Sequence, residues 1–285
     1  ITYIGTSHLE KLGSRDAIAE GKLQIVKNFS NENVLIYNSD SDYLSEAEIA
    51  RRTGGEFRMF SVGSSEHCDL RVRSLRACES GGISFALEHG ISRQVINMPV
   101  LGTHNAINAA LAAAVGLVYG VDLEAAAKAL SEPGHNPRRL ELHEIAGVLL
   151  IDDSYNASPE SMKAALDAFD KLRAERKIAI LADMLELGSG EQGGHEAVGI
   201  RIASSTVDKL YAIGPRAKTY VQPASYKNDI QIIYSEKLEM VEDRIMRDIG
   251  PGDAVLIKGS NITGVADLAQ RLKAELRDRE EGGLD

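Results

Sequence analysis

Residues 148–162 read VLLIDDSYNASPESM, and this stretch decides the fold of the second half of the chain. Its continuous apolar start is typical of a strand buried on both faces of a parallel sheet, and it stops on two adjacent acids, Asp152 and Asp153. Ser158 and Pro159 then follow in the order of a helix cap and a first helical residue. Since ligands bind beyond the carboxyl ends of strands in such sheets, the acids indicate a ligand crevice.

The same pattern recurs downstream of this strand. Four further apolar segments, each followed by a helical stretch, read KIAILADM (177–184), KLYAIG (209–214), IQIIYS (230–235) and GDAVLIKGSN (252–261). Buried strands that alternate with helices predict a parallel sheet covered on both faces. We therefore predict an α/β chain whose second half, residues 141–285, is a doubly wound, Rossmann-like domain.

The first half has a less regular pattern. We expect residues 1–5 (ITYIG) to form a strand, a helix to begin after Ser14, and residues 56–98 to form a small antiparallel sheet. Thr103 is expected to cap an alanine-rich helix that ends near Gly120. Residues 133–147, with two prolines and a basic pair, are the best candidate boundary, so we assign residues 1–140 to a first domain.

Composition excludes several classes of protein. The chain has 285 residues, a net charge of −10 and 44% hydrophobic residues, which argues against nucleic-acid binding through bulk charge. Its longest apolar stretch is too short to span a bilayer, and its two cysteines form no disulfide framework. We expect a cytoplasmic monomer without membrane insertion. Because the sequence starts at Ile1, without methionine and on a strand-like segment, we interpret it as part of a longer chain.

Two pairs of residues could carry chemistry in the first half. Asn105 and Asn108 share one face at the start of the alanine-rich helix, and an amide complements the adenine edge. His8 follows a strand-like segment and Lys22 lies in the next helix; a carbamate on that lysine would supply the oxygen ligands that magnesium prefers. For both pairs, ordinary helix-end or solvated roles are the favoured alternative on spacing alone.

Two further motifs remain open. Arg138 and Arg139, at the presumed hinge, suit base stacking or phosphate binding, or else form a surface pair. Gly188, Gly190 and Gly193 match G-x-G-x-x-G, but they do not directly follow a strand, so we interpret the match as chance within a flexible loop.

Taken together, five stretches resemble the Mur ligase family, and within it the MurF ligases. They are IGTSHLEKLGS with IAEGK, LGTHNAINAALAAAVG, RRLE with LLIDDSYNASPESMKAAL, ILADMLELG, and GDAVLIKGS. The resemblance implies the later part of the family's central ATPase domain followed by its Rossmann-like C-terminal domain. The family's glycine-lysine phosphate loop is not found among these residues, so we expect this chain alone to be inactive.

The resemblance also implies roles for individual residues. His8 would bind magnesium and Lys22 would be the carbamoylated lysine, and these two are the catalytic and metal residues. ATP would be held through its adenine by Asn105 and Asn108, with Arg139 reaching the nucleotide and Asp153 bonding the ribose. The remaining motif residues are expected to contact substrate: Asn156, Ser158, Asp183, Glu186, His195, Lys258 and Ser260.

The activity that the resemblance implies is ATP-dependent amide ligation in peptidoglycan precursor synthesis. A peptide carboxylate of UDP-N-acetylmuramoyl-tripeptide would attack ATP to give an acyl phosphate, and the amine of D-alanyl-D-alanine would then attack that carbonyl. Magnesium would neutralise phosphate charge. Three alternatives stay open: a Mur-type ligase with another acceptor, a non-catalytic nucleotide-binding module and, more distantly, a dinucleotide-dependent oxidoreductase.

Overall fold

The protein is described from a computed structural model that covers residues 1–285 except 7–8, 79–80, 133, 135–136 and 283–285. The chain divides into two compact units, Ile1–Gly134 and His135–Asp285. Each unit has its own sheet and its own buried core, so each is described by itself. In the described part of the chain, every helix is too short or too polar to cross a membrane.

The first unit is built on a five-stranded sheet with the order β1-β2-β3-β4-β5. Its strands are β1 (Val34–Asn38), β2 (Arg58–Gly63), β3 (Leu70–Ala77), β4 (Ile83–His89) and β5 (Ser92–Met98). Strands β3, β4 and β5 pair antiparallel, as predicted, whereas β1, β2 and β3 pair in parallel. The expectation of an antiparallel sheet over residues 56–98 was therefore wrong for β2, which pairs in parallel with β3, since the pattern of a strand does not fix its direction.

The helices of this unit cover the sheet and a separate apolar cluster. They are α1 (Leu9–Leu12), α2 (Arg15–Leu23), η1 (Gln24–Val26), α3 (Glu46–Thr53), α4 (His104–Val118) and α5 (Leu123–Ser131). Ser14 caps α2 as predicted, by accepting a hydrogen bond from the Ala17 amide. Thr103 precedes α4 but its side chain makes no capping hydrogen bond, because its own backbone is already helical.

The first residues of the chain form no strand, contrary to expectation. They lie beside β1, where the Asn38 amide donates to the Ile1 carbonyl at 3.1 Å and the Ile1 amine donates to the Ile36 carbonyl at 2.7 Å. Two backbone bonds hold the segment without a continuing ladder, which explains the difference.

The second unit contains a six-stranded sheet with the order β10-β9-β8-β11-β7-β6. Its strands are β6 (Glu141–Ile145), β7 (Val148–Asp153), β8 (Arg176–Ala182), β9 (Lys209–Ile213), β10 (Gln231–Ser235) and β11 (Asp253–Lys258). All of them pair in parallel except β6, which is antiparallel to β7 at one edge. This edge strand was not predicted, since its polar alternation was interpreted as part of the boundary.

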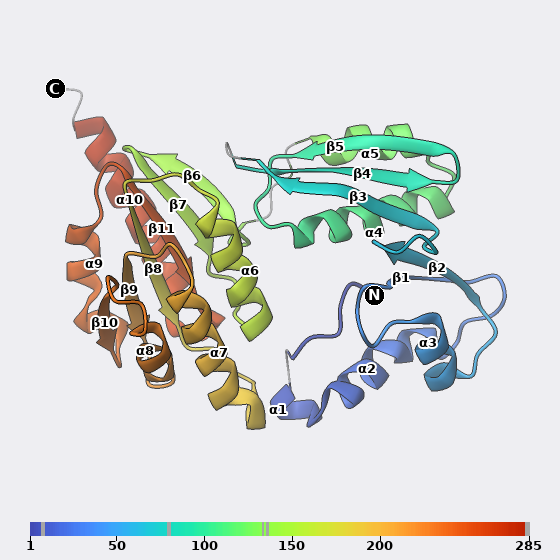
Figure 1. Cartoon of the computed structure of the whole chain (residues 1–285), viewed down its shortest axis with the longest axis horizontal. Coiled ribbons are helices and arrows are strands. Elements are labelled where there is room, and N and C mark those ends of the chain that lie inside the picture. The colour runs from blue at the N-terminus through green and yellow to red at the C-terminus, as the bar shows by residue number, and fades with distance from the viewer. Residues whose placement is uncertain (7–8, 79–80, 133, 135–136, 283–285) are drawn as a thin grey trace. The chain divides into compact units, whose positions relative to one another are not determined.

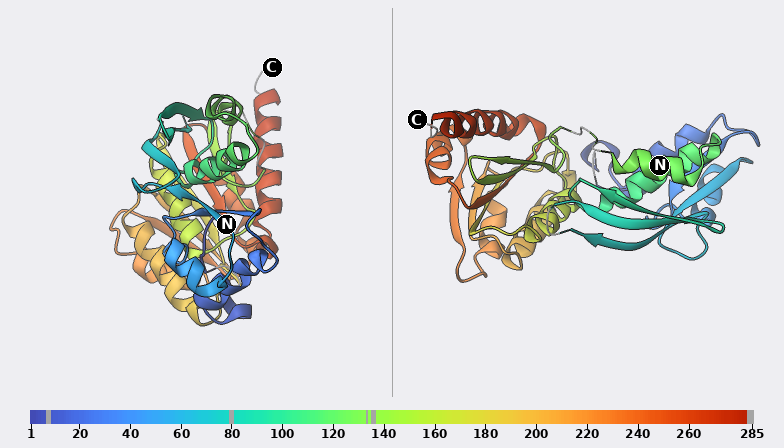
Figure 2. Two further views of the ribbon diagram at one scale, coloured as in Figure 1. Left: turned by 90° about the vertical axis from the view of Figure 1, so that its right-hand side faces the viewer. Right: turned by 90° about the horizontal axis from the view of Figure 1, so that it is seen from above.

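Helices cover both faces of this sheet, which confirms the predicted doubly wound architecture. They are α6 (Pro159–Asp170), η2 (Gly188–Gly190), α7 (Glu191–Ala203), α8 (Lys218–Ala224), η3 (Leu238–Met240), α9 (Glu242–Asp248), η4 (Asn261–Thr263) and α10 (Val265–Gly282). Figure 1 shows α6, α7 and α8 on one side of the strands and α9 and α10 on the other. The long α10 lies along its side of the sheet in both views of Figure 2.

Candidate functional site

The two acids that end β7 point to opposite faces of the sheet, because side chains alternate along a strand. Asp153 lies on the face of α6. Its Oδ1 accepts a hydrogen bond from the Leu140 amide at 3.1 Å, and its Oδ2 lies 2.7 Å from the Lys258 ammonium at the end of the neighbouring β11. Lys258 also donates to the Asn156 carbonyl at 2.8 Å. Asp153, Asn156 and Lys258 therefore form one cluster at the carboxyl end of the sheet.

Asp152 has its own lysine on the other face. Its Oδ2 lies 2.7 Å from the ammonium of Lys273 in α10, and its Oδ1 accepts hydrogen bonds from the amide and the hydroxyl of Ser154. All three side chains are buried. Removing one partner of such a buried ion pair costs about 3–5 kcal/mol, so these pairs hold the end of β7 firmly.

The segment before β6 is folded back onto this end of β7. The Tyr155 amide donates to the Arg138 carbonyl at 3.1 Å, and the guanidinium of Arg139 lies 4.0 Å from the centre of the Tyr155 ring. Arg138 and Leu140 have φ of 59° and 51°, a region that non-glycine residues rarely adopt. This strained turn places an exposed Arg139 and an exposed Tyr155 next to the Asp153 cluster.

His195, in α7, is fully buried and serves the fold. Its Nδ1 donates to the Glu191 carbonyl at 2.7 Å, its Nε2 accepts from the Met184 amide at 3.2 Å, and its ring stacks on Tyr220 with 5.1 Å between centroids. Burial lowers its pKa, which keeps the ring neutral. Both nitrogens are engaged, so a direct substrate contact would require the loop after β8 to move.

Asp183 and Ser260 also make hydrogen bonds within the protein, and these bonds join neighbouring loops. The Ala217 amide donates to Asp183 Oδ1 at 2.7 Å, and burial raises the pKa of this carboxyl. The Ser260 amide donates to the Asp183 carbonyl at 3.0 Å, while its hydroxyl accepts from the Leu185 amide at 2.9 Å. Glu186, in the same loop, has a left-handed φ of 61°. Ser158 caps α6 in a full capping box with Ser161.

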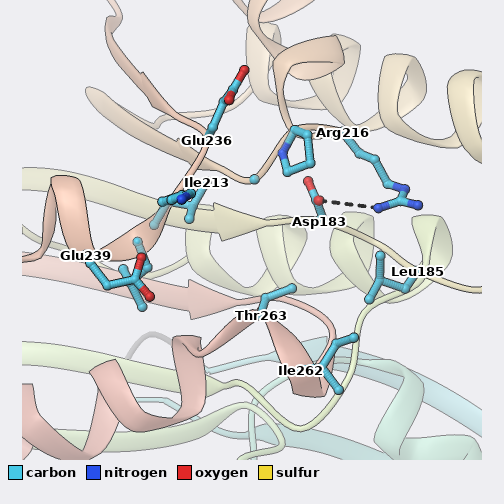
Figure 3. Close-up of a pocket in the computed structure, with 12 residues that line it drawn as sticks. Asp183, Leu185, Ile213, Arg216, Glu236, Glu239, Ile262 and Thr263 are labelled. Atoms are coloured by element: carbon cyan, nitrogen blue, oxygen red, sulfur yellow. Dashed lines mark ion pairs between the residues drawn. The ribbon is translucent and has the colours of Figure 1, made fainter.

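A hollow of about 570 Å³ opens at the carboxyl ends of β8 to β11. Figure 3 shows the Asp183 carboxylate and the Arg216 guanidinium facing one another there, 3.8 Å apart. The hollow is lined by Asp183, Leu185, Ile213, Gly214, Pro215, Arg216, Glu236, Lys237, Leu238, Glu239, Ile262 and Thr263. Its lining combines charged and apolar groups, and it lies at the edge of the sheet where α/β folds bind ligands.

In the first unit, Asn105 and Asn108 are neighbours on α4. The Asn108 side-chain amide donates to Asn105 Oδ1 at 3.2 Å, and the Asn105 side-chain amide donates to the Leu101 carbonyl at 2.8 Å. Asn105 is therefore fixed at the helix start, and Asn108 is the exposed member of the pair.

Of the two predicted metal residues, only Lys22 lies in the described part of the chain. The Lys22 ammonium donates to the Tyr3 carbonyl at 2.8 Å, and partial desolvation lowers its pKa. A lowered pKa fits the carbamate expectation, because carbon dioxide adds to the neutral amine. His8 lies outside the described residues. Within residues 1–6, 9–78, 81–132, 134 and 137–282, no three His, Cys, Asp or Glu side chains are grouped as a metal site.

Two family models match the chain over most of its length. The Mur ligase middle domain matches residues 1–116, and the Mur ligase glutamate ligase domain matches residues 138–261. The chain belongs to the Mur ligase family. This Mur ligase chain is 34% identical, over 276 residues, to the UDP-N-acetylmuramoyl-tripeptide–D-alanyl-D-alanine ligase of Bacillus subtilis, and 26% identical, over 281 residues, to that of Escherichia coli. It spans 58% and 59% of the length of these relatives, and they cover 95% and 96% of it.

Solved structures confirm the predicted fold and the resemblance to MurF. MurF from Acinetobacter baumannii superposes with a TM-score of 0.84 at 26% identity, covering 96% of this chain and 59% of that protein. MurF from Thermotoga maritima, solved with ADP, superposes with a TM-score of 0.81 at 24% identity, covering 98% and 62%, and shows the shared fold.

The predicted site residues thus differ in their exposure to solvent. Arg139, Asn156 and Asn108 are exposed, whereas Lys258, His195, Ser260 and Asp183 are buried and bonded within the protein. Tyr155 was missed as a candidate. Its signal was present in the sequence, as an aromatic residue between the acid pair and the helix cap.

Proposed function

We propose that this Mur ligase chain handles ATP and the incoming amine in an ATP-dependent ligase that joins D-alanyl-D-alanine to UDP-N-acetylmuramoyl-tripeptide through an acyl phosphate, in the cytoplasm. The Bacillus subtilis relative, named for that reaction, supports the substrates. The observation that carries the nucleotide part is the cluster of Asp153, Lys258 and Arg139 at the carboxyl ends of β7 and β11.

In this proposal four predicted residues contact ATP, and each is assigned its own part of the nucleotide. Asn105 and Asn108 bind the adenine, with Asn108 making the direct contact because Asn105 is already bonded to the backbone. Asp153 accepts hydrogen bonds from the ribose hydroxyls, since ionised carboxylates are strong acceptors for such groups. The Arg139 guanidinium, presented over Tyr155, reaches the nucleotide.

We propose that magnesium serves the reaction through His8 and Lys22. The ion would supply neutralisation of the phosphate charge. Lys22, with its lowered pKa, is suited to become the carbamate that would bind it. Substrate contacts by Asn156 and by the hollow next to Asp183 are part of the same proposal, whereas Ser158, Glu186, His195 and Ser260 would act by holding the loops around these groups.

The test is phosphate release in the protein that carries this chain. We expect release only when ATP, UDP-N-acetylmuramoyl-tripeptide and D-alanyl-D-alanine are all present. Replacing the dipeptide with single amino acids separates this proposal from a Mur-type ligase with another acceptor. Phosphate release that is indifferent to the acceptor, or ATP binding without release, would contradict it.

Asp153→Ala tests the ribose contact. A hydrogen bond to a charged group is worth roughly tenfold or more in affinity, so we expect the variant to lose at least that factor for ATP and little for 2′,3′-dideoxy-ATP. Isothermal titration with both nucleotides measures the two losses. An equal loss for both would mean that Asp153 does not meet the ribose.

A further inference from the structure

Lys258 occupies an unusual place for a residue expected to bind substrate. It exposes 2% of its surface, and its ammonium lies between Asp153 Oδ2, at 2.7 Å, and the Asn156 carbonyl, at 2.8 Å. Burial of a charge is costly unless that charge is paired and hydrogen-bonded. Here the charge is paired, and a ligand could reach the ammonium only if Asp153 or Asn156 moved.

We propose that Lys258 is a positioning residue, which orients the Asp153 carboxylate and the Asn156 backbone so that the protein prefers nucleotides with both ribose hydroxyls. This inference rests on the proposed function, in which Asp153 meets the ribose. It assigns Lys258 an effect on ligand discrimination without a ligand contact.

The sheet makes this orientation rigid. Lys258 and Asp153 are direct partners in the parallel register of β11 and β7, so the ammonium needs to cross only one strand spacing. The other carboxylate oxygen, Oδ1, is held by the Leu140 amide at 3.1 Å. Because each oxygen has a fixed donor from a different element, the carboxylate cannot rotate freely. Loss of Lys258 would release one side of it.

The chain offers a matched control in the neighbouring pair. Asp152 and Lys273 are also 2.7 Å apart, with side-chain exposures of 0% and 6%, but they lie on the opposite face of β7. Lys273 pairs with Asp152 and lies 3.7 Å from Glu141, so removing its ammonium leaves the fully buried Asp152 carboxylate without a cation while the Lys258–Asp153 pair stays in place. A loss that comes only from weakened folding should therefore appear in both lysine variants.

The experiment compares Lys258→Met, Lys273→Met and Asp153→Ala in the protein that carries this chain. Isothermal titration gives the ratio of the dissociation constants of 2′,3′-dideoxy-ATP and ATP, and urea unfolding gives the stability. We expect a ratio of roughly ten or more in the unmodified protein and in Lys273→Met, and a ratio near one in Lys258→Met, while both lysine variants lose stability.

Each other outcome contradicts either the positioning role of Lys258 or the ribose contact of Asp153. If Lys258→Met keeps the ratio, or if Lys273→Met loses it equally, Lys258 has no specific positioning role. If Asp153→Ala itself leaves the ratio unchanged, the ribose contact of the proposed function fails instead. Should Lys258→Met not fold, Lys258→Gln, which keeps a hydrogen-bond donor without the charge, is measured in its place and should give a reduced ratio.

Discussion

The positive φ of Gly214 lets the loop after β9 pack closely against the Asp183 carboxylate. Its φ is 108°, and a Cβ added there would overlap the Asp183 carboxylate, which the Ala217 amide holds from the other side. Only glycine adopts such a conformation without strain. The carboxylate and the glycine therefore form one structural unit at the edge of the hollow.

Gly214→Ala should lower the free energy of unfolding by roughly 1–3 kcal/mol, because it combines backbone strain with a clash. The matched control is Gly193→Ala in α7, where nothing lies within 4 Å of an added Cβ. That change should stabilise by about 0.5–1 kcal/mol, since alanine favours helix. Urea unfolding of both variants checks the prediction, and an unchanged midpoint for Gly214→Ala would contradict it.

The lowered pKa of His195 leads us to expect that the free energy of unfolding depends on pH. Its pKa is lowered in the folded state by burial, so between that value and its usual pKa of about 6.5 the unfolded chain binds more protons. Stability should be fully present above about pH 6.5 and fall as the pH is lowered toward the folded pKa. Urea unfolding at several pH values should show a shallower slope for His195→Gln. A slope equal to that of the unmodified protein would rule out this histidine as its source.

The limits of sequence reasoning are also clearest at single residues. The pattern of motifs correctly placed Asp153 and Lys258 at strand ends, but it could not show that the lysine would pair with the acid across the sheet. That pairing depends on β11 inserting between β7 and β8, a tertiary fact. The burial of His195 against Tyr220 of α8 likewise leaves no trace in local sequence.

At the scale of elements, the predicted side-chain cap of α6 is present, whereas the predicted side-chain cap of α4 is not. Ser158→Ala removes the hydrogen bond from the Ser161 amide to Ser158 Oγ at the start of α6 and should destabilise the protein by about 1 kcal/mol. Thr103→Ala, at the start of α4, should change little, because the Thr103 side chain makes no capping bond. Thermal unfolding of the two variants measures the difference. Equal shifts would mean that the capping box carries no net stability.

Most elements of the second unit could be predicted because its strands are continuous apolar runs between clear helix signals. The antiparallel edge strand β6 was missed, since its alternating residues resembled the polar boundary around them. In the first unit, the parallel pairing of β2 with β3 was missed because strand direction depends on crossover connections rather than on local pattern. Residues 1–5 have the apolar pattern of a strand but lack the ladder that defines one.

At the scale of the whole molecule, each unit has its own hydrophobic core. One cluster gathers Leu87 with residues of β2 to β5, α4 and α5, and another gathers Leu272 with residues of the six-stranded sheet, α9 and α10. A unit with its own core is expected to unfold as a cooperative block. The chain should therefore show two unfolding transitions rather than one.

Leu87→Ala and Leu272→Ala test this expectation, since both side chains are fully buried. Truncating a buried leucine costs about 2–5 kcal/mol, partly through the cavity that it leaves. We expect each variant to shift a different transition in differential scanning calorimetry and to leave the other in place. If both variants move the same transition, or if one sharp transition covers the whole chain, the two cores unfold together.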